Sequence, residues 1–187
     1  MKKKIAALAL GLLLCAGLTD CGSESEDTGS AGSGSAVTAT TEAGPTLQQE
    51  IISFVGDSLP SISGDRDRAV QLYNEYFSVG GEKDSDKWMT TLSQEALPKY
   101  DTYLGNLKAL KTTNPEVESL KKLYLESAEL QRDAIQLVVD AITNADSTIL
   151  DQAQKKVDDS KAKLEEFNTQ LKTLCEQNNI TLEGIGE

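Results

Sequence analysis

The chain has 187 residues, 39% of them hydrophobic and 5% aromatic, so its core must be built mainly from aliphatic side chains. A formal net charge of −12 disfavours nucleic acid and anionic membrane surfaces as partners, because both repel a uniformly acidic protein. The chain contains no histidine, which removes the most common general base and the most common transition-metal ligand.

The N-terminus has the parts of an export signal. Residues 2–4 are lysines, and residues 5–18 form an uncharged apolar run. This run is shorter than the ~20 residues that cross a bilayer as a helix, and it suits the apolar region of a signal peptide. An ordinary secretory signal or an uncleaved anchor would share these two features.

The residues that follow favour a third possibility. Leu18-Thr19-Asp20-Cys21 resembles the lipobox of bacterial lipoproteins, although Asp20 stands where that class usually has a small uncharged residue. The resemblance implies that residues 1–20 are removed and that Cys21 is acylated, with palmitate or a similar chain. It also implies a location outside the cytoplasm, on the outer surface or, with two membranes, on the periplasmic side. The lipid bilayer is then one partner of the chain.

Between the signal and the folded part, residues 21–45 form a predicted tether. They are rich in glycine, serine, threonine and acidic residues, and they offer little apolar surface to bury, which predicts disorder. A coil of this length holds a domain on the order of 25–30 Å from the lipid. We expect the domain itself to span residues 46–180 and residues 181–187 to form a loose tail.

The folded part is predicted to be an all-α bundle organised around a long C-terminal hairpin, residues 115–178. Two heptad seams, separated by a polar break at residues 143–146, favour antiparallel neighbours. Folding about this break matches Ala134 with Val157, Leu130 with Ser160 and Ser127 with Leu164. The first seam is Val117, Leu120, Leu123, Ser127, Leu130, Ala134, Leu137 and Ala141, and the second is Leu150, Ala153, Val157, Ser160, Leu164, Phe167, Leu171 and Leu174.

Shorter helices are predicted before the hairpin. Thr46 and Gln49 form a possible capping box for a first helix, and Gly56, Pro60 and Gly64 then predict a break before a second helix at residues 65–78. A third helix should begin at residue 84 or 85 and run to about residue 111. Because Pro98 lies inside it, we expect a kink or a break near residues 95–97.

Aromatic residues supply the one candidate ligand site. They recur at helical spacing on the second and third predicted helices, as in a cleft for a sugar or a peptide. The same spacing fits an ordinary bundle core that uses tyrosine at its margins, and we favour this interpretation. The candidate residues are Tyr73, Tyr76, Trp88, Tyr100 and Tyr103.

Catalytic and metal sites are not predicted. Cys175 stands near the end of a helix beside Glu176, where nothing lowers the pKa of a thiol, so we interpret it as a packing residue. Acidic pairs such as Asp65 with Asp67 lack the ligand spacing of a calcium loop. We therefore expect no cofactor, no metal and no enzyme activity. The sequence favours a non-enzymatic surface lipoprotein that binds an envelope protein or scaffolds an envelope complex, with a small-ligand receptor as the alternative.

Overall fold

The computed structural model describes residues 44–181, of which 86% are helical and none forms a strand. The predicted all-α class is therefore confirmed. The regular helices are α1 (Leu47–Ile52), α2 (Leu59–Ser78), α3 (Ser85–Thr91), α4 (Leu97–Ala109), α5 (Pro115–Thr143) and α6 (Ile149–Gln177). Shorter helical turns join some of them: the π-helical turns Ser53–Ser58 and Leu92–Ala96, and the 3-10 turn Gly81–Asp84.

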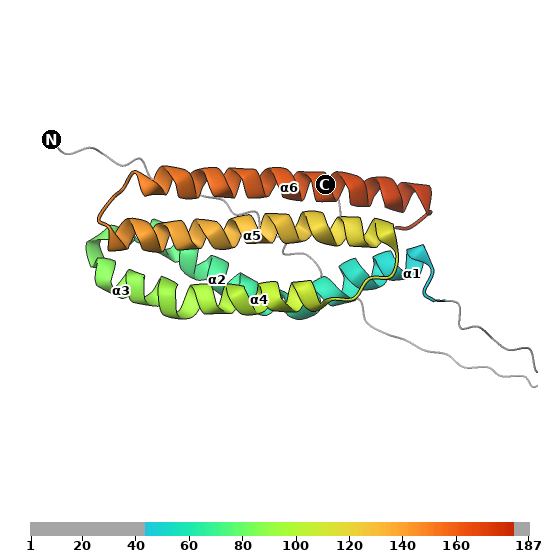
Figure 1. Cartoon of the computed structure of the whole chain (residues 1–187), viewed down its shortest axis with the longest axis horizontal. Coiled ribbons are helices and arrows are strands. Elements are labelled where there is room, and N and C mark those ends of the chain that lie inside the picture. The colour runs from blue at the N-terminus through green and yellow to red at the C-terminus, as the bar shows by residue number, and fades with distance from the viewer. Residues whose placement is uncertain (1–43, 182–187) are drawn as a thin grey trace, which may run out of the picture.

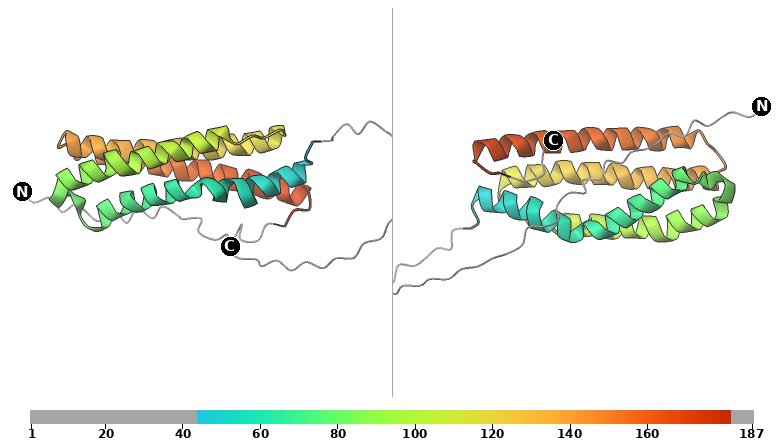
Figure 2. Two further views of the ribbon diagram at one scale, coloured as in Figure 1. Left: turned by 90° about the horizontal axis from the view of Figure 1, so that it is seen from below. Right: turned by 180° about the vertical axis from the view of Figure 1, so that it is seen from behind.

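These elements form an up-down-up-down bundle of long helical rods (Figure 1). One rod consists of α1 and α2, the next of α3 and α4, and α5 and α6 are the predicted hairpin, which packs along its whole length. Figure 2 shows the same arrangement from below and from behind. The start of α1 and the end of α6 lie at one end of the bundle, which we call the α1 end. The turns before α3 and α6 lie at the other, the α3 end.

Local signals start α1 and α5 where the sequence predicts. The Thr46 hydroxyl accepts a hydrogen bond from the Gln49 amide, and the Gln49 side chain accepts one in return from the Thr46 amide, 2.9 Å away. Asn114 caps α5 through its side-chain oxygen, 2.8 Å from the Glu116 amide, and Pro115 follows. Both caps satisfy amide groups that the first turn of a helix leaves unpaired.

The predicted break between the first two helices is wrong. Residues 47–78 form one continuous helical rod, in which Pro60 is the second residue after the π-helical turn Ser53–Ser58. The amide of Leu59 donates to the carbonyl of Phe54, five residues back. A proline inside an α-helix crowds the preceding turn, and the wider π turn takes up this conflict without ending the helix.

Pro98 repeats the arrangement in the second rod. The amide of Leu97 donates to the carbonyl of Leu92, again five residues back, across the π-helical turn Leu92–Ala96. This is the position at which the sequence predicts a kink or a break. In the structure the turn before Pro98 is widened, and the helix continues as α4 without a break.

The hairpin register is close to the predicted one but differs in its polar layer. Ala134 and Val157 line the same small apolar cavity, as their predicted match requires. The hydroxyl of Ser127, however, lies 2.9 Å from that of Ser160 and 3.0 Å from its carbonyl oxygen. The sequence matched each serine with a leucine. The two serines meet because each is a polar group on an apolar seam and needs a hydrogen-bond partner when buried.

A second buried face of α5 was not predicted. It packs against α4, and parts of it contact α1, α3 and the π-helical turn Leu92–Ala96. Tyr124 on this face reaches Arg66 of α2. Because α5 is covered on two sides, it carries two seams, whereas the hairpin alone requires one. Buried or half-buried residues of this second seam are Lys121, Tyr124, Ala128, Gln131, Ile135 and Val138.

Candidate functional site

The five candidate aromatic residues all lie in the core, each with at most 5% of its surface exposed. They fall into two groups. Tyr73, Tyr76 and Trp88 pack near the α3 end, where the Tyr76 ring makes edge contacts with Phe77 at 4.9 Å and with Trp88 at 6.0 Å between ring centres. Tyr100 and Tyr103 stack edge to face on α4, 5.5 Å apart. Within the described residues, none of the five lines an open cleft.

Tyr100 begins a chain of hydrogen bonds through the middle of the bundle. Its hydroxyl donates to Oε1 of Gln131 at 2.7 Å, and the side-chain amide of Gln131 donates to the hydroxyl of Ser160 at 3.0 Å. Ser160 in turn meets Ser127. The chain joins α4, α5 and α6, so it ties three helices together at one level in an otherwise apolar core.

Arg66 on α2 makes a second polar cluster beside Tyr103. Its guanidinium donates to the Tyr124 hydroxyl at 2.5 Å and to Asp67 at 2.7 Å, and it lies 5.7 Å from the centre of the Tyr103 ring. An arginine over an aromatic face is a favourable contact when both are shielded from water. This cluster and the Tyr100 chain connect every long rod of the bundle.

Three of the buried tyrosines are neutral groups. Burial raises the pKa of Tyr73, Tyr100 and Tyr103 well above the ordinary range of a phenol. Burial also raises the pKa of the Cys175 thiol, because a charged thiolate is poorly solvated there. None of these groups is therefore activated as a base or as a nucleophile.

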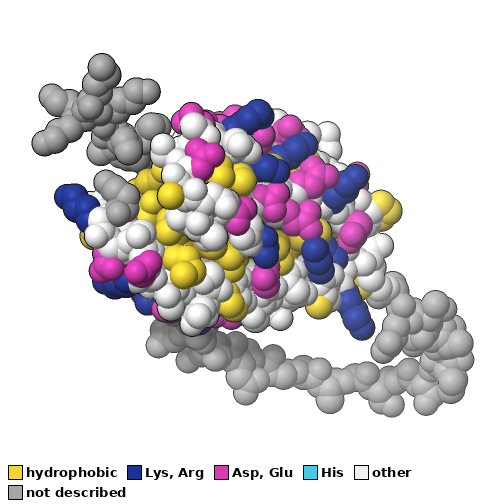
Figure 3. Space-filling view, turned by 60° about the vertical axis from the view of Figure 1, so that its left-hand side comes forward, with side chains coloured by type: hydrophobic (Ala, Val, Ile, Leu, Met, Phe, Trp, Pro, Cys, Tyr) yellow, Lys and Arg dark blue, Asp and Glu magenta, His cyan; other side chains and the backbone are white. Residues whose placement is uncertain are grey.

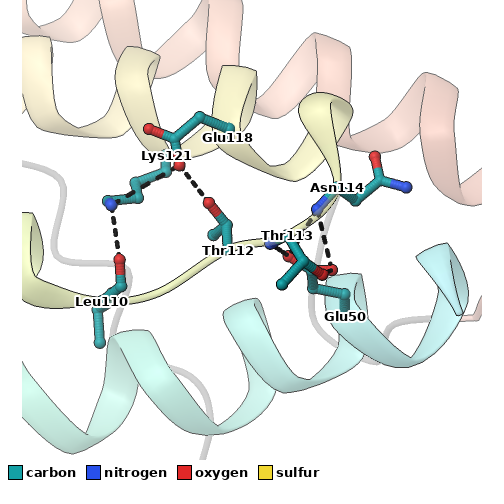
Figure 4. A network of polar contacts seen from close by, with 7 residues as sticks. All are labelled: Glu50, Leu110, Thr112, Thr113, Asn114, Glu118 and Lys121. Atoms are coloured by element: carbon teal, nitrogen blue, oxygen red, sulfur yellow. Dashed lines mark hydrogen bonds and ion pairs between the residues drawn. The ribbon is translucent and has the colours of Figure 1, made fainter. Parts of the chain in front are cut away.

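Glu50 on α1 forms the most concentrated polar contact of the α1 end (Figure 4). Its carboxylate accepts hydrogen bonds from the hydroxyl of Thr113 at 2.6 Å, the amide of Thr113 at 2.5 Å and the amide of Asn114 at 3.1 Å. Burial by itself would raise the pKa of Glu50, but these hydrogen bonds outweigh it and hold the pKa below its ordinary value. The carboxylate also lies at the N-terminus of α5, where a negative charge is favourable.

Lys121 stabilises the connection between α4 and α5, which Glu50 also contacts. Its buried ammonium group donates to the carbonyl of Leu110 at 2.6 Å and lies 3.7 Å from the carboxylate of Glu118, which accepts a hydrogen bond from Thr112. Figure 4 shows Glu50 and Lys121 bracketing the α4–α5 connection. An open groove of about 400 Å³ lies beside it, lined by Lys108, Pro115, Glu118, Ser119, Lys121, Lys122 and Leu125.

The surface is mixed in charge, with an apolar area towards the α3 end. Figure 3 shows apolar side chains gathered on one part of this view, while acidic and basic side chains cover much of the rest. The most exposed large apolar residues near this end are Val79, at 58%, and Met89, at 36%. Val79 ends α2 and Met89 lies in α3, so neighbouring elements present both.

Other candidate features give no site. Among residues 44–181, no group of three or more carboxylates or thiols is arranged to hold a metal ion. In that same range, no helix is long and apolar enough to cross a bilayer. Cys21, the predicted lipid attachment point, and residues 182–187 of the predicted tail lie outside the described residues, so both remain predictions.

Comparisons with known proteins give no family for this chain. No family model, no curated protein and no solved structure matches it.

Sequence reasoning missed the polar residues that organise the core: Glu50, Arg66, Lys121, Tyr124 and Gln131. A signal for them exists. Glu50 lies three residues after Leu47 and four before Phe54, on the apolar face of its helix. Lys121 and Gln131 likewise lie on one heptad seam of α5, together with Tyr124, Ala128 and Ile135. A polar residue within an apolar seam indicates a buried hydrogen-bonding group.

Proposed function

We propose that this chain is a bacterial lipoprotein, anchored in a bilayer through acylated Cys21, whose helical domain binds a protein partner without catalysing a reaction. The lipobox at residues 18–21 supports the anchor. The position of the bundle agrees with this role, because α1 begins at Leu47, directly after the Thr46 cap. Residues 22–45 then separate the acylated cysteine from the domain.

The proposal that the domain binds a protein partner rests on the exposure of Val79 and Met89 at the α3 end. Exposed apolar side chains gathered on one part of a domain are typical of protein interaction sites, and these two belong to elements that follow one another in the chain. The chain enters the domain at the opposite end, next to α1 (Figure 1). A bundle held from the α1 end can present its α3 end to a partner away from the bilayer.

The alternative, a small-ligand receptor with a tyrosine-lined cleft, has less support. Tyr73, Tyr76, Trp88, Tyr100 and Tyr103 are all buried, so a ligand could reach them only after the helices separate. The groove beside the α4–α5 connection contains none of the five. The assignment of these residues to ligand binding therefore stays a prediction.

The anchor predicts a specific effect of Cys21→Ser. This variant should accumulate as an unprocessed precursor and should take up no labelled fatty acid, because serine has no thiol to acylate. Metabolic labelling with an acyl analogue, followed by mass spectrometry of the N-terminus, measures both effects. Cys175→Ser is the matched control and should be labelled like the wild type. Equal labelling of the Cys21→Ser variant and the wild type would exclude the anchor.

The partner surface predicts that Val79→Ser combined with Met89→Ser weakens crosslinking to the partner in cells by about tenfold or more, which corresponds to ~1.4 kcal/mol of binding free energy. Both side chains are exposed, so the free energy of unfolding should change little. Ile52→Ser is the matched control, because Ile52 is 43% exposed at the α1 end. An equal loss of crosslinking in the control would place the contact elsewhere.

A further inference from the structure

The first helix of the domain is short and is held by few contacts. α1 has six residues, fewer than the length at which a helix is stable by itself in water. Its main neighbours are α5 and the π-helical turn that follows it. Its buried residues are Ile51, which is completely covered, and Glu50. The attachment of α1 therefore depends on one aliphatic side chain and one carboxylate, with help from half-buried Leu47.

The carboxylate makes all of its tertiary hydrogen bonds to one short segment. Glu50 accepts from Thr113 and Asn114, the two residues that precede α5. The amide of Asn114 has no partner within α5, because the first turn of a helix cannot satisfy its own amides. Glu50 thus supplies from α1 a cap that belongs to another helix. If α1 moves away, the cap is lost with it.

The segment after α1 has the features of a hinge. In the π-helical turn Ser53–Ser58, Gly56 is exposed, and a side chain added at Gly56 would meet no neighbouring atom. Glycine costs a helix up to about 1 kcal/mol relative to alanine, and π turns are irregular sites in a helical rod. Phe54 and Val55 of the same turn come before Gly56 and are buried, so the rod is held on the core directly after α1. Motion of α1 can therefore occur at the start of the turn, before Phe54, while the rest of the turn and α2 stay in place.

We propose that α1 is a strap that opens from the bundle about the Ser53–Ser58 turn, with the Glu50 carboxylate as its catch. Opening uncovers the amides of Thr113 and Asn114, together with the apolar surface under Ile51. These groups fit a partner segment that carries a carboxylate beside an aliphatic residue, as α1 does. Because α1 is the first helix of the bundle, a pull on the preceding chain acts directly on the catch. The strap does not depend on the lipid anchor.

Amide hydrogen exchange of the full chain in detergent micelles, followed by NMR, tests the strap. The amides of Glu50, Thr113 and Asn114 should exchange through one common opening, faster than the amides of Val138 and Leu171 in the centres of α5 and α6. Glu50→Gln should speed exchange of the three amides by about tenfold or more, and the three should remain faster than the amides of Val138 and Leu171.

Glu116→Gln is the matched control, since it removes a carboxylate from the exposed first turn of the same helix and should leave the three rates unchanged. Two results would overturn the strap. In the first, the three amides of the wild type exchange as slowly as those of Val138 and Leu171, which means that α1 opens only when the whole bundle unfolds. In the second, Glu50→Gln speeds exchange of the amides of Thr113 and Asn114 but not of the amide of residue 50. That result means that the side chain loses its hydrogen bonds while α1 remains packed on the bundle.

Discussion

Tyr100→Ala should lower the free energy of unfolding by about 3–5 kcal/mol, as measured by urea denaturation. The Tyr100 ring is fully buried, so its removal leaves a cavity among α4, α5 and the neighbouring aromatic residues. Gln131 also loses the hydroxyl that donates to its side-chain oxygen. A loss this large is a substantial fraction of the stability of a typical domain, so the variant should also melt at a clearly lower temperature.

Tyr100→Phe separates the contribution of the buried ring from that of the hydrogen bond to Gln131. Phenylalanine keeps the ring and removes only the hydrogen bond to Gln131, so the expected cost is about 1–3 kcal/mol, the penalty of an unpaired buried acceptor. Tyr103→Phe is the matched control on the same helix, because the Tyr103 hydroxyl is not part of the Tyr100–Gln131–Ser160 chain. A Tyr100→Phe variant as stable as the wild type would show that the chain adds no net stability.

Glu50→Gln should lower the free energy of unfolding by about 1.5–3 kcal/mol at neutral pH, because the amide forms weaker hydrogen bonds than the carboxylate with Thr113 and Asn114. The pKa of Glu50 is lower in the folded state than in the unfolded chain. Its contribution is therefore complete above the unfolded value, about 4.3, and is lost as the pH falls through the lower folded value.

The stability difference between the wild type and Glu50→Gln should consequently be constant from neutral pH to about pH 5 and should shrink below pH 4.3. Urea titrations at a series of pH values measure it. Glu116→Gln, which removes an exposed carboxylate near the same helix end, should show a much smaller difference at every pH. A Glu50→Gln difference that stays constant down to pH 2 would show that the Glu50 carboxylate contributes no charge-dependent stability.

Features that depend only on neighbouring residues can be predicted from the amino-acid sequence. Thr46 with Gln49 marks the start of α1, Asn114-Pro115 marks the start of α5, and the heptad seams predict two long antiparallel helices. Caps and periodic apolar faces act over a few residues, so they can be recognised without knowing the fold. The lipobox resemblance is equally local, and it concerns residues that lie before the described part of the chain.

The roles of the buried polar residues and the continuation of the helices through their prolines depend on tertiary packing. Gln131, Arg66 and Glu50 could each have faced water, and their roles follow from partners at least 29 residues away in the sequence. The same holds for Pro60, which predicts a helix end by local rules but lies within a continuous rod. A buried polar group needs a hydrogen-bond partner, and a helix that contains an irregular turn depends on tertiary packing to continue. Both conditions are met by residues that become neighbours only when the bundle has formed.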